Sequence, residues 1–136
     1  MQHSTDTLWT VFTGGGISVI AYLVGGVDNL IIALGVLMAA DFISGVMTAF
    51  TVKNISSKSA FQGLMKKSAM ILAVIVANQL DVITGGTGQF MRNAMLMFLI
   101  GTEGISFIEN LGKLGVKVPV QISSAFSQLK DKGEDK

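Results

Sequence analysis

Two groups of polar residues with the same spacing lie inside apolar stretches of the chain. Each group has a carboxylate at position i and hydroxyl or amide side chains at i+3 and i+7. The first group is Asp41, Ser44 and Thr48, with Gly45 beside them, and the second is Glu103, Ser106 and Asn110. On a helix this spacing places all three side chains of a group on one face. Such side chains can bond neighbouring helices together, line water, or share a proton.

A third polar pair, Asn78 and Asp81, lies three residues apart in another apolar stretch. A charged residue near the centre of a membrane helix costs about 2.5–3.5 kcal/mol, so such residues face other protein or water rather than lipid. We therefore take the three groups as candidates for pore lining or for assembly. Asp81 and Arg92, on either side of a Gly-rich turn, are expected to pair with each other.

The composition indicates a membrane protein. Of 136 residues, 50% are hydrophobic and 14% charged, with a net charge of +1 and a mean hydropathy of +0.60. Soluble domains carry about 25% charged residues, and a soluble four-helix bundle would show a polar face that residues 30–40 lack. No basic face suggests nucleic acid as a partner. No arrangement of residues suggests an enzyme, a cofactor or a metal site.

Four apolar stretches approach the roughly 20 residues that a membrane-spanning helix needs. They cover residues 8–24, 30–50, 69–83 and 91–108, and three consecutive glycines interrupt the first. We predict an all-α integral membrane protein with four transmembrane helices, or three if the first stretch lies on the membrane surface. Spaced small residues, such as Gly35 with Ala39, predict close helix packing and oligomerisation.

The lysines predict the orientation, because basic residues collect in short cytoplasmic loops. Lys53, Lys58, Lys66 and Lys67 lie in the predicted connection at 51–67, and five more lysines follow the fourth stretch. Four spans then place both termini in the cytoplasm, whereas three spans move the N-terminus outside. Because Lys66 and Lys67 belong to the connection in this reading, no basic residue is expected at mid-membrane to complete a proton relay.

The chain is predicted to divide into a transmembrane region, residues 1–110, and a cytoplasmic tail, residues 111–136. In the tail, Ile122, Ala125, Phe126 and Leu129 form an apolar stripe that suits the inner membrane surface or a neighbouring subunit. The charged end, KDKGEDK, is expected to be disordered.

The two carboxylates are expected at the same depth. Asp41 lies eleven residues after Leu30, and Glu103 eleven after Arg92. At 1.5 Å per residue, both lie roughly 16 Å from the outer ends of helices that run in the same direction. A purely structural role between helices and a role in lining a pore both fit this placement.

Three segments, DFISGVMTAF, NISSKSAFQGLMKK and GTEGISFIENLGKLGVKVP, resemble in order and spacing the holins of phage lysis and toxin secretion in Gram-positive bacteria. The resemblance covers residues 17–119. It is carried most specifically by Asp41, Gly45, Glu103, Gly104, Glu109, Asn110 and Gly115.

The resemblance implies a protein of the bacterial cytoplasmic membrane that forms large homo-oligomers. These open lesions through which an endolysin, or in some bacteria a toxin, reaches the cell wall and the host is lysed, without any necessary direct contact between the partners. Because a single 136-residue chain cannot enclose a wide channel, several copies are needed in any case. The alternatives are a narrow oligomeric ion or small-solute channel with a carboxylate ring, and a structural membrane partner without conduction.

Overall fold

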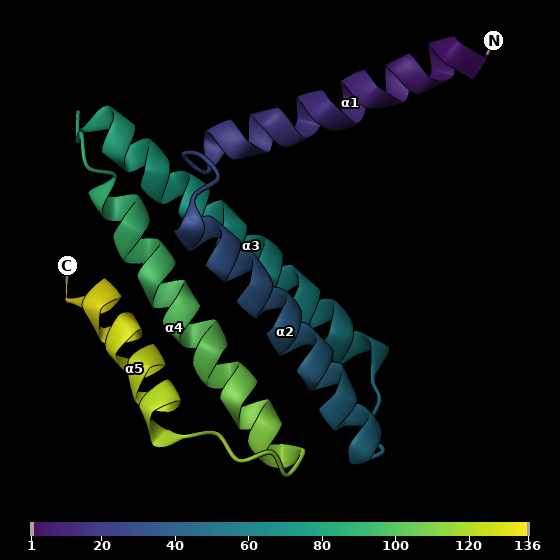
Figure 1. The fold of residues 1–136 in the computed structure, drawn as a ribbon, viewed down its shortest axis with the longest axis vertical. Helices are drawn as coiled ribbons and strands as arrows, with labels where there is room; N and C mark the ends of the chain where they lie inside the picture. Colours follow the sequence, from purple (N-terminus) through teal and green to yellow (C-terminus); the bar gives the residue numbers. More distant parts are fainter. Residues whose placement is uncertain (1, 136) are drawn as a thin grey trace.

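The computed structural model describes residues 2–135, with side chains from residue 5 onward, and the described chain is all helical (Figure 1). The termini of the predicted regions, residues 1 and 136, lie outside the described residues. Five helices follow one another in the chain. They are α1 (Gln2–Leu23), α2 (Asn29–Thr51), α3 (Ser57–Ile83), α4 (Phe90–Lys113) and α5 (Val120–Glu134).

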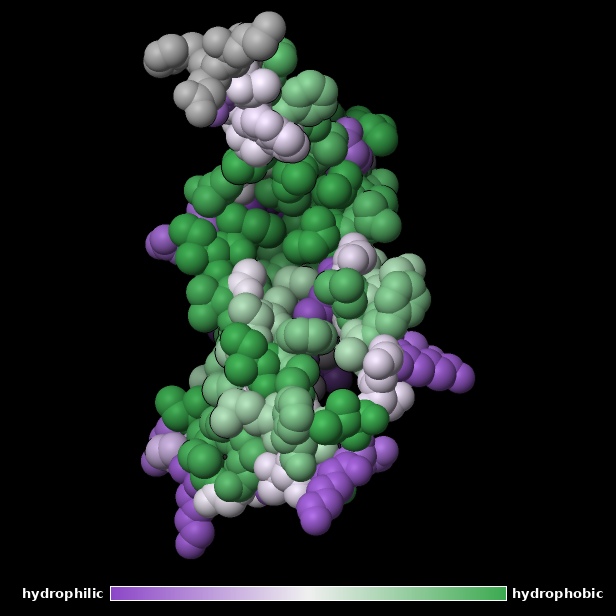
Figure 2. Space-filling model, turned by 90° about the vertical axis from the view of Figure 1, so that its right-hand side faces the viewer, coloured by the Kyte–Doolittle hydropathy of each residue, from purple (hydrophilic) through white to green (hydrophobic). Residues whose placement is uncertain are grey.

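Three helices, α2, α3 and α4, are long and apolar enough to cross a membrane, and no other helix within residues 2–135 is. The three-span alternative therefore fits the structure. α1 is a helix as predicted, but it leaves the bundle at an angle, and the only helix it contacts is α3, toward the C-terminal end of that helix (Figure 1). Large side chains of α1 such as Trp9 and Phe12 are exposed. The face shown in Figure 2 is mostly hydrophobic, with hydrophilic side chains gathered mainly at its lower end.

The helix boundaries follow from local polar contacts. Asp28 ends the first Gly-rich turn and accepts a hydrogen bond from the Ile31 N–H at 3.0 Å, while Ser56 accepts one from the Ser59 N–H at 3.4 Å. Both are N-cap contacts that satisfy backbone donors left free at a helix start. α3 therefore begins twelve residues before the predicted third span. It includes Lys58, Lys66 and Lys67 of the predicted connection, whereas Lys53 lies in the turn before it.

Helix α4 occupies the centre of the fold, because α2, α3 and α5 all pack against it. Leu34, Val74 and Leu96, one residue from each of α2, α3 and α4, have no exposed surface and form the middle of the core. Between α2 and α3 there is little direct packing. The three spanning helices are thus held together chiefly through α4.

The tail differs from the sequence-based expectation. Its charged end, expected to be disordered, is helical through Glu134, and α5 packs on α4 in the same chain more extensively than any other pair of helices. Of the predicted apolar stripe, Phe126 and Leu129 pack against the core of the same chain, whereas Ile122 and Ala125 are exposed. The tail's cytoplasmic location stays a prediction.

We expect Val74→Ala to lower the free energy of unfolding in detergent micelles by about 1–2 kcal/mol, because two methyl groups are lost from a fully packed site. Val76→Ala is the matched control, since Val76 lies on the same helix and is 60% exposed. Equal effects of the two substitutions on chemical unfolding would contradict the arrangement of the core.

Candidate functional site: two buried polar clusters

The middle of the bundle contains an ion triad that joins all three spanning helices. The Nζ of Lys67 on α3 donates to Asp41 Oδ2 on α2 at 2.7 Å, and it also donates to Glu103 Oε2 on α4. The side chains of Lys67, Asp41 and Glu103 are 12%, 15% and 1% exposed. The two carboxylates therefore lie at one depth, as predicted, but they meet on a lysine rather than on each other.

The presence of Lys67 corrects the expectation that no basic residue lies at mid-membrane. α3 begins at Ser57, so Lys67 lies well inside this helix, one or two turns before the buried Met70 and Val74. Lys67 lies three residues before Met70 and seven before Val74, so its side chain is on the same face of α3 as theirs. Extending that periodicity toward the N-terminus would have found Lys67 in the sequence.

Asn110 completes the mid-bundle cluster from the C-terminal half of α4. Its Nδ2 lies 3.2 Å from both the backbone oxygen and Oδ1 of Asp41, and 3.1 Å from Ser44 Oγ. A Cβ on Gly45 would lie 3.6 Å from the same Nδ2, which is an ordinary van der Waals contact. Thr48 bonds to the Ser44 backbone oxygen within its own helix, at 2.9 Å.

A pocket of about 320 Å³ opens beside this cluster between α2, α3 and α4. Asp41, Lys67, Asn110 and Ser106 are among its lining residues. Glu103 Oε1 has no hydrogen-bond partner among the described residues. When all three groups are ionised, the triad carries a net charge of −1, because it has two carboxylates and one ammonium. Separating it would leave uncompensated charge in an apolar interior, which is strongly unfavourable.

The second cluster lies at one end of the bundle, around the turn between α1 and α2. Arg92 has no exposed side-chain surface, and its guanidinium donates to Asp28 Oδ2 at 2.7 Å and to the Gly26 carbonyl at 2.9 Å. It also donates to the Val24 carbonyl. Arg92 thus pairs with Asp28, which the sequence analysis missed, and not with Asp81 as expected.

Asn78 and Asp81 belong to this second cluster, so the structure does not bring them near Asp41. Asp81 accepts the backbone N–H groups of Met91 and Arg92 at 2.9 and 2.8 Å and so caps the start of α4. Asn78 donates to the Leu23 carbonyl at 3.0 Å. Both residues therefore join elements at this end of the bundle.

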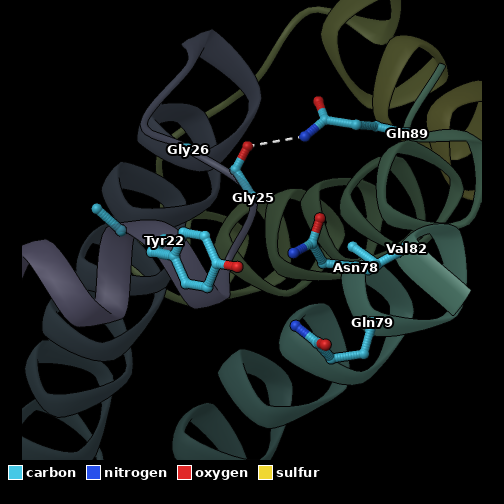
Figure 3. A pocket seen from close by; sticks show the side chains of 8 residues that line it. Tyr22, Gly25, Gly26, Asn78, Gln79, Val82 and Gln89 are labelled. Carbon is cyan, nitrogen blue, oxygen red and sulfur yellow. Dashed lines mark hydrogen bonds between the residues drawn. The ribbon is translucent and has the colours of Figure 1, made fainter. Parts of the chain in front are cut away.

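A pocket of about 430 Å³ adjoins the turn, with Asn78, Gln79 and Val82 of α3 facing Tyr22 and the two turn glycines (Figure 3). Gln89 donates to the Gly25 carbonyl across it at 2.8 Å. Gly25 has a φ of +82°, and a Cβ there would collide with Asn78 and Arg92. Only glycine both adopts this positive φ readily and has no Cβ to collide with the neighbouring side chains.

The two clusters hold the bundle at its middle and at one end. Three spanning helices with buried ionic contacts fit a membrane protein whose polar residues serve helix association.

We expect Lys67→Met to destabilise the bundle by about 3–5 kcal/mol, because Asp41 and Glu103 would be left buried without a counter-charge. Chemical unfolding in detergent micelles measures the effect. Lys66→Met is the matched control, since Lys66 is exposed on the neighbouring position of α3. Adding Asp41→Asn and Glu103→Gln to Lys67→Met should recover most of the loss. No recovery in the triple variant would contradict the charge explanation.

The pair at the turn predicts a dependence on pH. The hydrogen bond from Arg92 holds the pKa of Asp28 below its ordinary value of 3.8, helped by the Ile31 N–H and opposed by partial burial. The stabilisation from a lowered pKa is complete above the ordinary pKa and is lost as the pH falls through the lower pKa of the folded state.

Asp28→Asn should therefore lower the melting temperature at pH 7 and pH 5 alike, and the difference from the parent chain should shrink toward pH 3. Circular dichroism melting in micelles measures it. A difference that grows on acidification would contradict the assigned pair.

Comparison with known proteins agrees with this arrangement. The family model described as "Bacteriophage holin family" matches residues 18–131. A "Probable holin" of Bacillus phage phi105 is 38% identical over 116 residues, which cover 85% of this chain and 84% of that protein. An uncharacterized protein of Listeria innocua is 39% identical over 75% of this chain and 72% of its own length. An uncharacterized 14.9 kDa protein of Clostridium perfringens is 32% identical over 93% of this chain and 89% of its own length.

No solved structure gives a significant match to the chain. The family match extends over all three spanning helices and most of α5, and it includes both polar clusters. The chain belongs to the bacteriophage holin family, a family of non-enzymatic membrane proteins.

Proposed function

We propose that this holin assembles with copies of itself in the bacterial cytoplasmic membrane and opens lesions wide enough for a folded protein. An endolysin, or a toxin, would pass through them to the cell wall without needing to bind the holin. The observation that carries the proposal is the family membership together with three apolar spans in one small chain.

The packing of a single chain supports assembly. Leu34, Val74 and Leu96 fill the space between the three spanning helices, so any wide opening has to form between copies. Most large apolar side chains on the outside of α2 and α3, such as Val36 and Leu72, are exposed and available to lipid or to another copy.

The triad supports the lesion over the narrow channel. A carboxylate ring would need Asp41 or Glu103 to face a shared axis, whereas both are engaged with Lys67 inside the chain. We propose that these residues, with Ser44, Gly45, Thr48, Ser106 and Asn110, set the geometry of the subunit that assembles. Asn78 and Asp81 do the same at the other end.

The lysines support an orientation for three spans. Lys53 and Lys58 lie around the α2–α3 connection, and Lys113 and Lys117 lie around the α4–α5 connection. Both connections are at the same end of the bundle (Figure 1), which we propose is the cytoplasmic end. The N-terminal α1 then starts outside the cell, unless α1 inserts as a fourth span and places the N-terminus in the cytoplasm.

Expression beside a cytosolic wall-degrading enzyme that has no export signal tests the proposal. We expect abrupt loss of turbidity that requires both proteins, with the enzyme released to the medium. An enzyme variant without wall-degrading activity is the control, and it should be released without loss of turbidity. Loss of ion gradients with the enzyme retained would overturn the lesion in favour of the narrow channel.

A further inference from the structure

Helix α5 lies at the depth of the membrane-spanning part of α4. A Cβ on Gly101, at the middle of α4, would lie 2.6 Å from the backbone nitrogen of Lys130. A Cβ on Gly104 would collide with the ring of Phe126. On α5, a Cβ on Gly133 would lie 2.6 Å from the Phe98 Cβ. The three glycines let the two helices approach closely, and the order of the contacts shows that α5 runs antiparallel to α4.

The far end of α5 reaches the outer part of the bundle. Gly133 and Glu134 border a pocket of about 320 Å³ together with Met91 on α4 and Leu80 on α3. Met91 is the second residue of α4, at the end opposite the α4–α5 connection. α5 therefore follows α4 along most of its length (Figure 1).

The two sides of α5 differ in chemistry. Phe126, Leu129 and Gly133 share the side on α4, and the Lys130 ammonium lies 5.8 Å from the centre of the Phe98 ring. The side away from α4 is exposed and mostly polar, although Val120 and Ile122 at the start of the helix are exposed as well. Its exposed polar residues are Gln121, Ser124, Ser127, Gln128, Asp131 and Lys132.

Lipid is an unsuitable neighbour for that polar side, since charged side chains at this depth are strongly disfavoured in hydrocarbon. Within residues 2–135 no other helix covers it, because α5 packs extensively on α4 alone. Water satisfies a row of amide, hydroxyl and charged groups without any defined partner. Water at this depth requires an opening bounded by several copies of the chain.

We propose that α5 lines the water-filled opening of the assembled protein, with its apolar side on α4 and its polar side on the lumen. This inference rests on the proposed assembly and adds which segment faces the water. The spanning helices then need no polar outer face of their own, in agreement with the engagement of their carboxylates inside the subunit.

Spin labelling tests the proposal, and the chain has no cysteine to interfere. Single labels at Ser124→Cys and Gln128→Cys report the polar side of α5. Leu72→Cys, which is 62% exposed on α3, reports a lipid-facing site, and Lys53→Cys reports the surface. The full chain is reconstituted in vesicles of phosphatidylethanolamine and phosphatidylglycerol. Each label is probed with oxygen, a water-soluble nickel chelate and a headgroup-bound relaxing agent.

We expect the two α5 labels to respond to nickel rather than oxygen and yet to lie far from the headgroups. The Leu72→Cys label should respond to oxygen at a similar depth. Labels on α5 at the headgroup depth of Lys53→Cys would overturn the proposal and place α5 on the membrane surface. Labels on α5 with the oxygen response of Leu72→Cys would overturn it as well.

Release of a trapped folded enzyme from the same vesicles separates this inference from the proposed function. If the enzyme is released while the α5 labels lie at headgroup depth, the proposed lesion stands and the lining by α5 is rejected. If the enzyme is retained while the labels are deep and accessible to nickel, the lining by α5 stands and the proposed lesion is rejected.

A second pair of variants tests the glycine contact. Gly104→Leu should drive α5 off α4 and move the Ser124→Cys label toward the headgroups, because the new side chain collides with Phe126. Gly112→Leu on the same helix should leave the label in place, since no other side chain lies within 4 Å of a Cβ there. An unmoved label in the Gly104→Leu variant would contradict the packing on which the proposal depends.

Discussion

The ammonium of Lys67 lies between carboxylates from two other helices, in the middle of an apolar bundle. Each of the three charges is unfavourable in that setting by itself, and their mutual contact makes all three tolerable. Since the contact takes one residue from each spanning helix, it also fixes the depth of α2, α3 and α4 relative to one another. α2 and α3 pack little on each other, so the triad is their main polar connection.

Helix α4 carries two different contacts on two different sides. Toward α2 and α3 it presents Leu96, Glu103 and Asn110, which combine apolar packing with polar bonds. Toward α5 it presents Gly101 and Gly104, which give close approach of backbones. The first side holds the spanning bundle together, and the second brings an amphipathic helix to the same depth. α4 thereby connects the apolar spanning helices α2 and α3 to the amphipathic helix α5.

Hydropathy was sufficient to predict α2 and α4, because each is an apolar stretch close to spanning length. For α3 it predicted only the second part, since the apolar stretch begins at residue 69 and the helix at Ser57. The equal depth of Asp41 and Glu103 was predicted from residue counts for the same reason. Lys67 was missed because a lysine beside apolar residues also fits a cytoplasmic loop, and only the start of α3 at Ser57 separates the two readings. The pair of Arg92 and Asp28 was missed since it depends on how a Gly-rich turn folds back on α4. The stripe on α5 predicted a buried side but not the helix that buries it.

Solid-state NMR in lipid bilayers tests the central claim most directly, by measuring dipolar couplings between the Lys67 side-chain nitrogen and carboxyl carbons. We expect two carboxyl carbons, those of Asp41 and Glu103, to couple strongly to this nitrogen. We also expect each coupling to disappear when Asp41→Asn or Glu103→Gln shifts the corresponding carbon signal away. A Lys67 nitrogen that couples to neither carboxyl carbon and contacts lipid headgroups would rule out the triad, because the three spanning helices would then lack their common polar contact.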